Sequence, residues 1–343
     1  MEIKFGDKPI RTFTISPRTL DVSEYWGNIE KVVQWSEKYG HTGVLLFEGN
    51  DTLISPWIAA HEAVVTTKRI SPLVAVNPLY MHPFSVAKMV SSIALLHGRK
   101  VFLNMITGTA LNYLQALSDK AGHNDRYERL REYTVIIRKL LESTRPVTFQ
   151  GRYYQVENLV LPPGIPDELF PEFLVSGQSD SARKVCRELG GIGLQMLQPG
   201  FAEGLDEARA IHFGIVTRDT EAEAWSAAEA LFPEDEEGQA ILEYSMQNTD
   251  SVWKRRMMLA ADEPDRSSSG YWLAPFRNFK ADCPYIVGSY DLVGQVLASL
   301  VIAGIEMFVL NISVDEQEFV HIQRAFELAM ERLQSPCEAP SCN

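Results

Sequence analysis

The chain has 343 residues, of which 45% are hydrophobic, and it carries 32 Lys and Arg against 45 Asp and Glu, a formal net charge of −13. A chain of this length and apolar content can bury one large core, which favours a single domain of barrel size. The acidic balance argues against nucleic acids and anionic membranes as partners, because both attract surfaces rich in Lys and Arg.

Targeting and redox signals indicate a cytoplasmic protein. No apolar run is long enough to span a bilayer, and the first residues, Met1-Glu2-Ile3-Lys4, show no basic and then apolar export signal. The four cysteines, at positions 186, 283, 337 and 342, include no Cys-x-x-Cys pair of the kind that binds metals. We therefore expect a reduced cytoplasmic protein that has no metal site and does not bind a membrane.

Short runs rich in Val, Ile and Phe alternate along the chain with longer stretches of helical spacing. The predicted strands are 11–16, 43–48, 71–77, 101–106, 172–176, 193–197, 211–217 and 305–312. The predicted helices are 23–39, 55–67, 84–96, 125–143, 179–189, 220–231, 290–303 and 316–333. Eight such alternations favour an α/β fold of the (β/α)₈ TIM barrel type over a doubly wound sheet.

We expect one barrel domain over residues 1–334, interrupted by two insertions and followed by a flexible Pro/Ser-containing tail at 335–343. The first insertion, at about 145–162, is predicted to be a hairpin with strands 147–150 and 153–156 around Gly151. The second, at about 232–284, is polar, with an acidic cluster at 234–237 and a basic patch at 254–256. Such an excursion is usually a lid or a mobile loop, and the alternative is a solvated linker without a role.

The helix predicted from Asp125 has the clearest pattern. Asp125 is placed near its N-cap, while Arg129 and Glu132 lie off the apolar face and can stay hydrated. The apolar face is formed by Tyr127, Leu130, Thr134, Ile137 and Leu141.

Polar residues follow the predicted fourth and fifth strands, at the end of a barrel where active sites lie. Asn104 and Thr107 close the fourth strand, and Gly108 would allow close backbone approach to a ligand. Ser176-Gly177-Gln178-Ser179 closes the fifth strand and opens a helix, whose exposed N–H groups suit a phosphate. The alternative is an ordinary helix cap that binds nothing.

His123 and Tyr127 are four residues apart, so both can face the same ligand atoms from the start of a helix. The alternative is that Tyr127 is a core residue, because it shares its face with Leu130 and Ile137.

Three further residues are candidates for catalysis. Glu48 follows the second strand, and His82 follows the third strand, where it could serve as acid or base or could simply cap the next helix before Pro83. Arg277 lies next to an apolar run in the second insertion and could close over an anionic substrate.

Three motifs in order, Asn104-Met105-Ile106-Thr107-Gly108, His123-Asn124-Asp125-Arg126-Tyr127 and Phe149-Gln150-Gly151-Arg152-Tyr153-Tyr154, resemble the bacterial luciferase-like family of flavin-dependent monooxygenases. The subgroup that the chain looks most like is the alkanesulfonate monooxygenases. The resemblance implies reduced FMN (FMNH2) as cofactor, O2 as co-substrate and a homo-oligomer. It also implies that Asn104 and Thr107 contact the flavin ring region, that His123 and Tyr127 reach the ribityl-phosphate chain, and that Ser176, Gly177, Gln178 and Ser179 hold the phosphate.

Departures from that subgroup concern the substrate. Its Arg-x-His pair is replaced by His212-Phe213-Gly214, and its Tyr after the eighth strand is replaced by Ser313. Its Cys falls near Thr52 or Leu53, where there is no thiol. A small or carrier-bound substrate of specialised or biosynthetic metabolism therefore fits better than an alkanesulfonate.

No Gly-x-Gly-x-x-Gly motif follows an early strand, so no site for a tightly held nicotinamide is found. A separate flavin reductase would then supply the reduced FMN. Two alternatives stay open: a deazaflavin-dependent oxidoreductase on the same barrel, and a non-catalytic flavin-binding protein.

Overall fold

The computed structural model describes residues 3–5, 8–17, 21–142, 144–201, 205, 207–260 and 269–334, so the predicted tail at 335–343 lies outside the described residues. The strands are β1 (Ile3–Phe5), β2 (Lys8–Ile15), β3 (Gly43–Leu46), β4 (Ser71–Val76), β5 (Phe102–Met105), β6 (Val147–Gln150), β7 (Gln155–Leu159), β8 (Glu172–Ser176), β9 (Ile192–Met196), β10 (Ala208–Arg218), β11 (Tyr271–Trp272), β12 (Tyr285–Ser289) and β13 (Met307–Asn311). The helices are α1 (Val22–Lys38), α2 (Pro56–Thr66), α3 (Pro83–His97), α4 (Leu111–Ala116), α5 (His123–Glu142), α6 (Asp180–Leu189), α7 (Glu221–Leu231), α8 (Glu236–Gln247), α9 (Val252–Ala260), α10 (Ala274–Arg277), α11 (Tyr290–Ile302) and α12 (Glu316–Gln334). No helix among the described residues is both long and apolar enough to cross a membrane.

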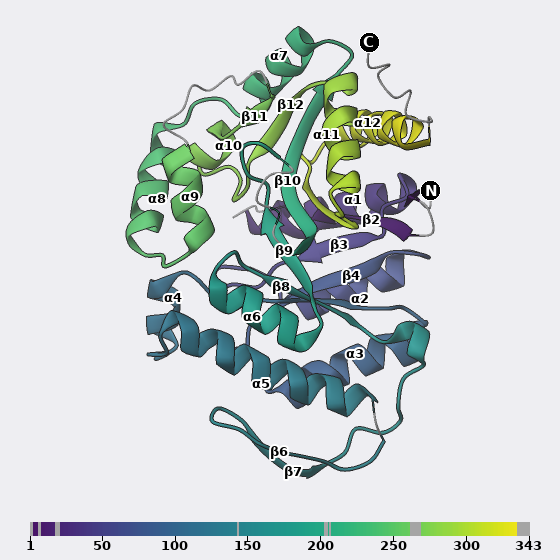
Figure 1. Cartoon of the computed structure of the whole chain (residues 1–343), viewed down its shortest axis with the longest axis vertical. Coiled ribbons are helices and arrows are strands. Elements are labelled where there is room, and N and C mark those ends of the chain that lie inside the picture. The colour runs from purple at the N-terminus through teal and green to yellow at the C-terminus, as the bar shows by residue number, and fades with distance from the viewer. Residues whose placement is uncertain are drawn as a thin grey trace, which may run out of the picture.

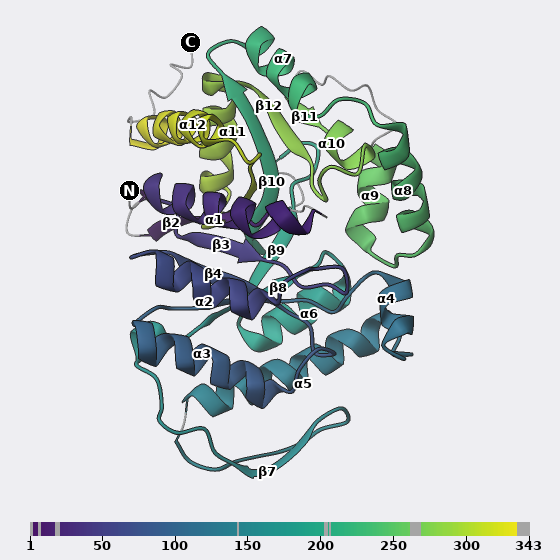
Figure 2. The same cartoon turned by 180° about the vertical axis from the view of Figure 1, so that it is seen from behind.

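Eight parallel strands close into a barrel in the order β2, β3, β4, β5, β8, β9, β10 and β13. The ring closes where β13 pairs with β2 in the register Met307 to Arg11. The helices lie around the outside of these strands, and the hairpin of β6 and β7 projects beyond α5 (Figures 1 and 2). The predicted (β/α)₈ TIM barrel is confirmed, and each of the eight predicted strands overlaps one of the barrel strands.

One strand is longer than the barrel needs. The first part of β10 pairs with β9 and β13, and its last part, from Gly214 to Arg218, pairs with β12. A Cβ on Gly214 would lie 2.3 Å from the Tyr285 ring, so glycine is required where β10 passes from one partner to the other. The sequence did not predict β12, because its short apolar run leads directly into α11 and resembles the start of that helix.

The barrel interior is a separate core to which every barrel strand contributes. Phe13 and Phe102 pack edge to face there, with ring centroids 5.0 Å apart. Their alternate neighbours along the strands face outward and pack beneath the helices. The interior residues are Phe13, Leu45, Leu73, Phe102, Leu174, Ile192, Leu194, Ala210, Met307 and Val309.

α5 fastens the hairpin to the barrel. It begins two residues earlier than predicted, and Asp125 accepts hydrogen bonds from Arg152 Nη1 at 2.8 Å and Tyr153 Oη at 2.9 Å. Glu132, which we expected to be hydrated, is 5% exposed and accepts from the backbone N–H groups of Arg152, Tyr153 and Tyr154. A buried carboxylate that accepts several backbone N–H bonds stays satisfied without water, which explains the difference.

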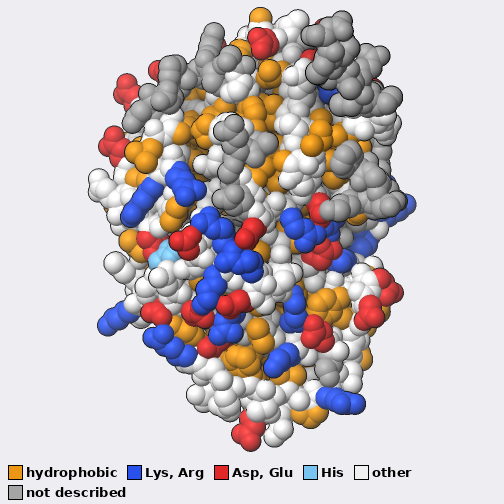
Figure 3. Space-filling view, in the orientation of Figure 1, with side chains coloured by type: hydrophobic (Ala, Val, Ile, Leu, Met, Phe, Trp, Pro, Cys, Tyr) orange, Lys and Arg blue, Asp and Glu red, His pale blue; other side chains and the backbone are white. Residues whose placement is uncertain are grey.

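The acidic net charge does not form a single-signed surface on the face of Figure 3, where basic and acidic side chains mix across the middle. Ion pairs join α5 and α6 in this way: Lys184 Nζ lies 2.8 Å from Glu128 and Arg131 Nε 3.6 Å from Glu188. Exposed pairs of this kind contribute little individually to stability.

The second insertion is largely helical within the described residues. α8 and α9 lie on the same side of the molecule as α4 in both views (Figures 1 and 2).

The segment between α8 and α9 is fastened to the barrel. Asn248 O accepts a hydrogen bond from Leu111 N at 2.8 Å, and Thr249 forms a β-bridge with Ala110. Asp250 pairs with Arg126 at 2.6 Å, and the Arg126 side chain is only 2% exposed. We call these contacts the clamp, and they anchor the middle of the insertion.

Candidate active site

A cavity of about 590 Å³ opens at the carboxyl ends of the barrel strands, in the range of about 300–1,000 Å³ that is usual for cofactor and ligand sites. All eight barrel strands contribute to its lining, either directly or through the residue that follows the strand. α4, α5, α8 and α9 also contribute to the lining, as do the segments 47–51 and 279–282. This is the end of the barrel where loops and strand termini converge in barrel enzymes.

The two-residue period of the strands places polar groups on the cavity floor. In each barrel strand, the last residue of the interior core is followed two positions later by a residue that lines the cavity. In this way Asn104 follows Phe102, Ser176 follows Leu174, His212 follows Ala210 and Asn311 follows Val309.

Asn104, Ser176 and Tyr127 form a hydrogen-bonded group on one wall, which we call the cradle together with Gly177, Gln178 and Ser179. Ser176 Oγ donates to Asn104 Oδ1 at 2.6 Å, and Tyr127 Oη donates to the Ser176 carbonyl at 3.0 Å. Burial raises the pKa of Tyr127, and hydrogen bonds with the side chains of Thr107 and Ser179 oppose that shift. Tyr127 thus belongs to both the core and the cavity lining. The residue is only 5% exposed, and its hydroxyl bonds to residues that line the cavity.

Gly177 has a backbone conformation that only glycine adopts readily, with φ of +138°. A Cβ there would lie 2.3 Å from the Tyr127 hydroxyl, so the space beside this residue is already filled. Next to it, the buried Gln178 Oε1 has no hydrogen-bond partner among the described residues. Ser179 then caps α6, with its Oγ accepting from Ala182 N at 3.2 Å. The cradle thus combines a helix N-terminus with an unsatisfied buried polar atom.

His123 and Thr107 complete this wall. His123 is the first residue of α5, and its ring centroid is 5.2 Å from that of Tyr127. Thr107 is 5% exposed and is followed by Gly108 with φ of +73°. All eight residues that the family resemblance assigned to the cofactor line this one cavity.

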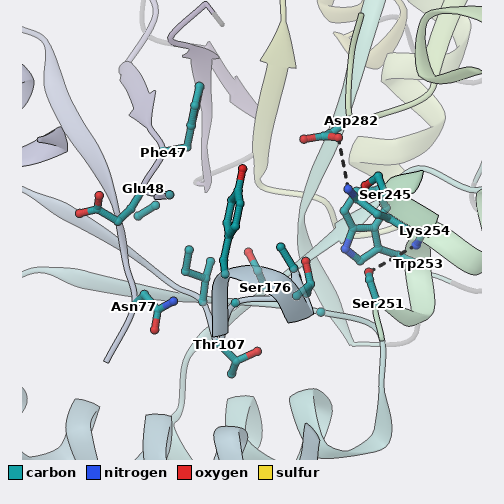
Figure 4. Close-up of a pocket in the computed structure, with 18 of the residues that line it drawn as sticks. Phe47, Glu48, Asn77, Thr107, Ser176, Ser245, Ser251, Trp253, Lys254 and Asp282 are labelled. Carbon is teal, nitrogen blue, oxygen red and sulfur yellow. Dashed lines mark hydrogen bonds and ion pairs between the residues drawn. The ribbon is translucent and has the colours of Figure 1, made fainter. Parts of the chain in front are cut away.

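Glu48 lines the cavity beyond the carboxyl end of β3, on the same side as Phe47 and Asn77 (Figure 4). Burial raises the pKa of the Glu48 carboxyl to about 7, although hydrogen bonds from the Gly49 backbone and the Thr52 side chain act to lower this pKa. Burial, and then the negative charge of Glu48, raises the pKa of Tyr80 to about 12, and Tyr80 Oη donates to Asn50 Oδ1 at 2.5 Å. A carboxyl with a pKa close to neutral pH can both hold and release a proton there.

The other two candidates for catalysis do not line the cavity. His82 is exposed and caps α3, with Nδ1 accepting from Phe84 N at 3.2 Å, which is the capping alternative that the sequence left open. Arg277 ends α10 and is not among the lining residues, which resume at Phe279. Glu48 is therefore the only one of the three that the structure brings to the site.

The sequence predicts a lid or a mobile loop for the second insertion, but it does not identify the residues of the insertion that line the cavity. This wall of the cavity is formed by Ser245 on α8, Trp253 and Lys254 on α9, and Asp282 (Figure 4). Lys254 Nζ lies 3.6 Å from Asp282 Oδ1. The basic patch at 254–256 was visible in the sequence, but its pattern does not tell which residue of the helix faces the cavity. His212 and Asn311 on the floor were also missed, although the two-residue period of their strands could have found them.

Comparison with known proteins places this geometry in context. The family model described as luciferase-like monooxygenase matches residues 11–305. The chain is 31% identical, over 316 residues, to BtrO of Niallia circulans, a monooxygenase of 4-(gamma-L-glutamylamino)butanoyl groups on the BtrI acyl-carrier protein. That alignment covers 89% of this chain and 92% of BtrO.

Two solved structures have a similar fold. Riboflavin lyase RcaE matches with a TM-score of 0.73 and 16% identity, over 96% of this chain and 94% of that chain. EDTA monooxygenase EmoA from Chelativorans sp. BNC1 matches with a TM-score of 0.71 and 16% identity, over 95% and 98%. At this level of identity the likeness is one of fold alone.

Proposed function

The chain belongs to the luciferase-like monooxygenase family, and from the geometry of its cavity we propose that it is a reduced-FMN-dependent monooxygenase with O2 as co-substrate. It would be the oxygenating component of a two-component system, with a separate flavin reductase as its partner. The observation that carries the proposal is the cradle, where a helix N-terminus, a glycine and buried polar groups converge at one end of a cofactor-sized cavity.

The cradle fits an FMN phosphate. The first N–H groups of α6 have no partner within the helix, and they favour an anion together with the helix dipole. The absence of a Cβ at Gly177 lets the Tyr127 hydroxyl lie close to this backbone, and Gln178 Oε1 is a buried acceptor that a ribityl hydroxyl would satisfy. In this proposal His123 and Tyr127 hold the ribityl-phosphate chain.

The flavin ring would lie over the floor, against Asn104 and Thr107. Bound reduced FMN would supply the electrons with which O2 is activated. The chain has to exclude water from that reaction, and the apolar side chains of the lining serve this purpose. They include Ile15, Leu45, Phe47, Leu194 and Met196.

Glu48 is the acid or base in this proposal. Because its pKa is about 7, its carboxyl oxygen carries a proton in a large share of molecules at neutral pH. It can therefore donate a proton to the substrate or accept one without a large energetic cost.

We propose that the substrate is a small or carrier-bound organic molecule of specialised metabolism. BtrO acts on an acyl group held by a carrier protein, and this chain lacks the Arg-x-His pair of alkanesulfonate enzymes. The rim of the cavity includes exposed apolar side chains, with Tyr244 59%, Ile241 42% and Leu117 42% exposed, so a long acyl arm could enter there.

Anaerobic calorimetry with reduced FMN, followed by O2 consumption with an added flavin reductase, tests the proposal. We expect Tyr127→Phe and His123→Ala to weaken reduced-FMN binding by about 1–3 kcal/mol each, because both side chains would hydrogen-bond the charged tail. Tyr133→Phe is a matched control: its buried hydroxyl donates to the Met81 carbonyl at 2.9 Å, outside the cavity.

No uptake of FMN in either redox state would contradict the proposal. Preferential binding of reduced deazaflavin would support a hydride-transfer enzyme instead. FMN binding that leaves oxygen reactivity unchanged with every substrate class would support a non-catalytic flavin-binding protein. A homo-oligomer remains a prediction, which light scattering of the purified protein tests.

A further inference from the structure

Lys254 is a cationic side chain of the cavity lining that has N–H donors left for a ligand. It lines the cavity from α9, and its side chain is 13% exposed. Its ion-pair partner, Asp282 Oδ1, lies at 3.6 Å, beyond the usual range of a hydrogen bond. An ammonium group has three N–H donors, and Lys254 Nζ donates to no other described residue.

The other lysine in the lining differs. Lys280 Nζ pairs closely with Asp235, and the Lys280 side chain is 44% exposed. Its charge is therefore already matched and hydrated. A mostly buried ammonium with a distant partner, such as that of Lys254, gains more from a new charge-assisted hydrogen bond.

The cavity is polarised between its two sides. Glu48 lies on the side of β3, and Lys254 lies on the opposite side with Trp253 and Ser245 (Figure 4). An anion would be repelled near Glu48 in its charged form and attracted near Lys254. A ligand that spans the cavity would thus be oriented with its anionic group towards the insertion wall.

We propose that Lys254 and Asp282 form a subsite for an anionic group of the substrate, a phosphate or a carboxylate, in which a ligand oxygen replaces Asp282 as the partner of Lys254. The proposal rests on the proposed function in one respect: the FMN phosphate is assigned to the cradle, so the anion at Lys254 belongs to a second ligand. The indole of Trp253, whose centroid is 5.6 Å from Lys254 Nζ, would cover the apolar part of that ligand.

The two residues should have opposite effects on binding. Lys254→Met removes the attraction and should weaken an anionic ligand about tenfold or more, whereas Lys254→Arg should largely retain binding. Asp282→Asn removes both the competing partner and a repulsive charge, so it should strengthen the same ligand several-fold. If the pair served only to hold α9, both Lys254→Met and Asp282→Asn would instead act in the same direction.

The test is a calorimetric titration of the FMN-loaded protein and its three variants with pantetheine 4′-phosphate, pantetheine and glutarate. We expect the phosphate or the dicarboxylate to show the opposite changes, and uncharged pantetheine to show none. A response to pantetheine 4′-phosphate alone would assign the subsite to a carrier arm, and a response to glutarate alone would assign it to an acyl carboxylate.

Two results would overturn the proposal. One is equal binding of both anionic probes by wild type, Lys254→Met and Asp282→Asn. The other is a loss in Lys254→Met of affinity for FMN but not for riboflavin, which would show that Lys254 holds the cofactor phosphate. Failure of the wild type to bind FMN would instead contradict the proposed function, and the anionic probes can be titrated into the flavin-free protein all the same.

Discussion

The two walls of the cavity are built differently. In the cradle, Asn104, Ser176 and Tyr127 come from β5, β8 and α5, and hydrogen bonds of 2.6 and 3.0 Å join them across those elements. The insertion wall consists of α8, α9 and the segment near Asp282, which the clamp anchors and a 3.6 Å ion pair joins. The first wall belongs to the barrel itself, and the second is added to it.

The two walls are therefore suited to different functions. A wall made of barrel strands and their following helices is held by the core, so it can position a cofactor with little movement. A wall made of an insertion can change in sequence and position without disturbing the barrel, which suits substrate selection. The cradle would then serve flavin chemistry, and the insertion wall would determine which substrate enters.

The largest expected effect comes from cutting the clamp. Asp250→Ala leaves Arg126, which is 2% exposed, as a buried charge without its partner, and should reduce the free energy of unfolding by about 3–5 kcal/mol. Denaturant unfolding measures this. Arg256→Ala, an exposed change on α9, is the control and should shift stability by less than about 0.5 kcal/mol. A loss below about 1 kcal/mol for Asp250→Ala would mean that the insertion is not anchored in this way.

The second largest effect is expected from adding a side chain in the cradle, which should affect FMN binding and not the insertion wall. In Gly177→Ala the new Cβ would lie 2.3 Å from the Tyr127 hydroxyl at a φ of +138°, so the backbone or Tyr127 must move. We expect at least about a tenfold loss of FMN affinity in calorimetry, the size of one lost hydrogen bond to a charged group. Gly190→Ala, at the other end of α6, has φ of +57° and no atom within 4 Å of the added Cβ, so it should leave flavin affinity unchanged. Equal flavin affinity in both variants would argue against a phosphate at the cradle.

Glu48 should make the free energy of unfolding depend on pH. Its folded-state pKa of about 7 lies above the ordinary value of 4.5, so the folded protein binds more protons than the unfolded chain between these values. The contribution of Glu48 to stability is therefore present below about pH 4.5 and is lost as pH rises to about 7.

Glu48→Gln should remove this slope. The variant should match the wild type near pH 4.5 and be the more stable of the two at pH 8, as measured by urea unfolding across the range. A constant difference between the two proteins at all pH values would show that Glu48 titrates normally. In that case the acid–base role of the β3 side would lose its support.

The smallest expected effect lies outside both walls. His82→Ala removes the cap of α3 and should cost about 0.5–2 kcal/mol of stability, with no change in flavin affinity or O2 consumption. A large loss of O2 consumption in His82→Ala, with normal FMN binding, would instead indicate that His82 takes part in catalysis.

Much of the barrel wall could be predicted from the sequence because its signals are local. Apolar runs mark the strands, the residues that close them, such as Asn104 and Ser176, are polar, and Tyr127 lies four residues after His123. Parallel strands in a closed barrel bring these ends together whatever the loops do. By contrast, only residue type and sequence neighbourhood indicate His82 and Arg277, and neither property tells which way a side chain points.

The sequence by itself determined the barrel, the order of its strands and the polar ends that meet at the cradle, because periodicity along a strand decides which residues face inward. Only the tertiary structure decided which residues of the insertion face the cavity. The contact between Arg126 and Asp250, 124 residues apart, anchors the segment just before α9, and Lys254 on α9 lines the cavity. Such a long-range contact leaves no periodic trace in either segment, because each residue is an ordinary charged side chain until the fold brings the two together.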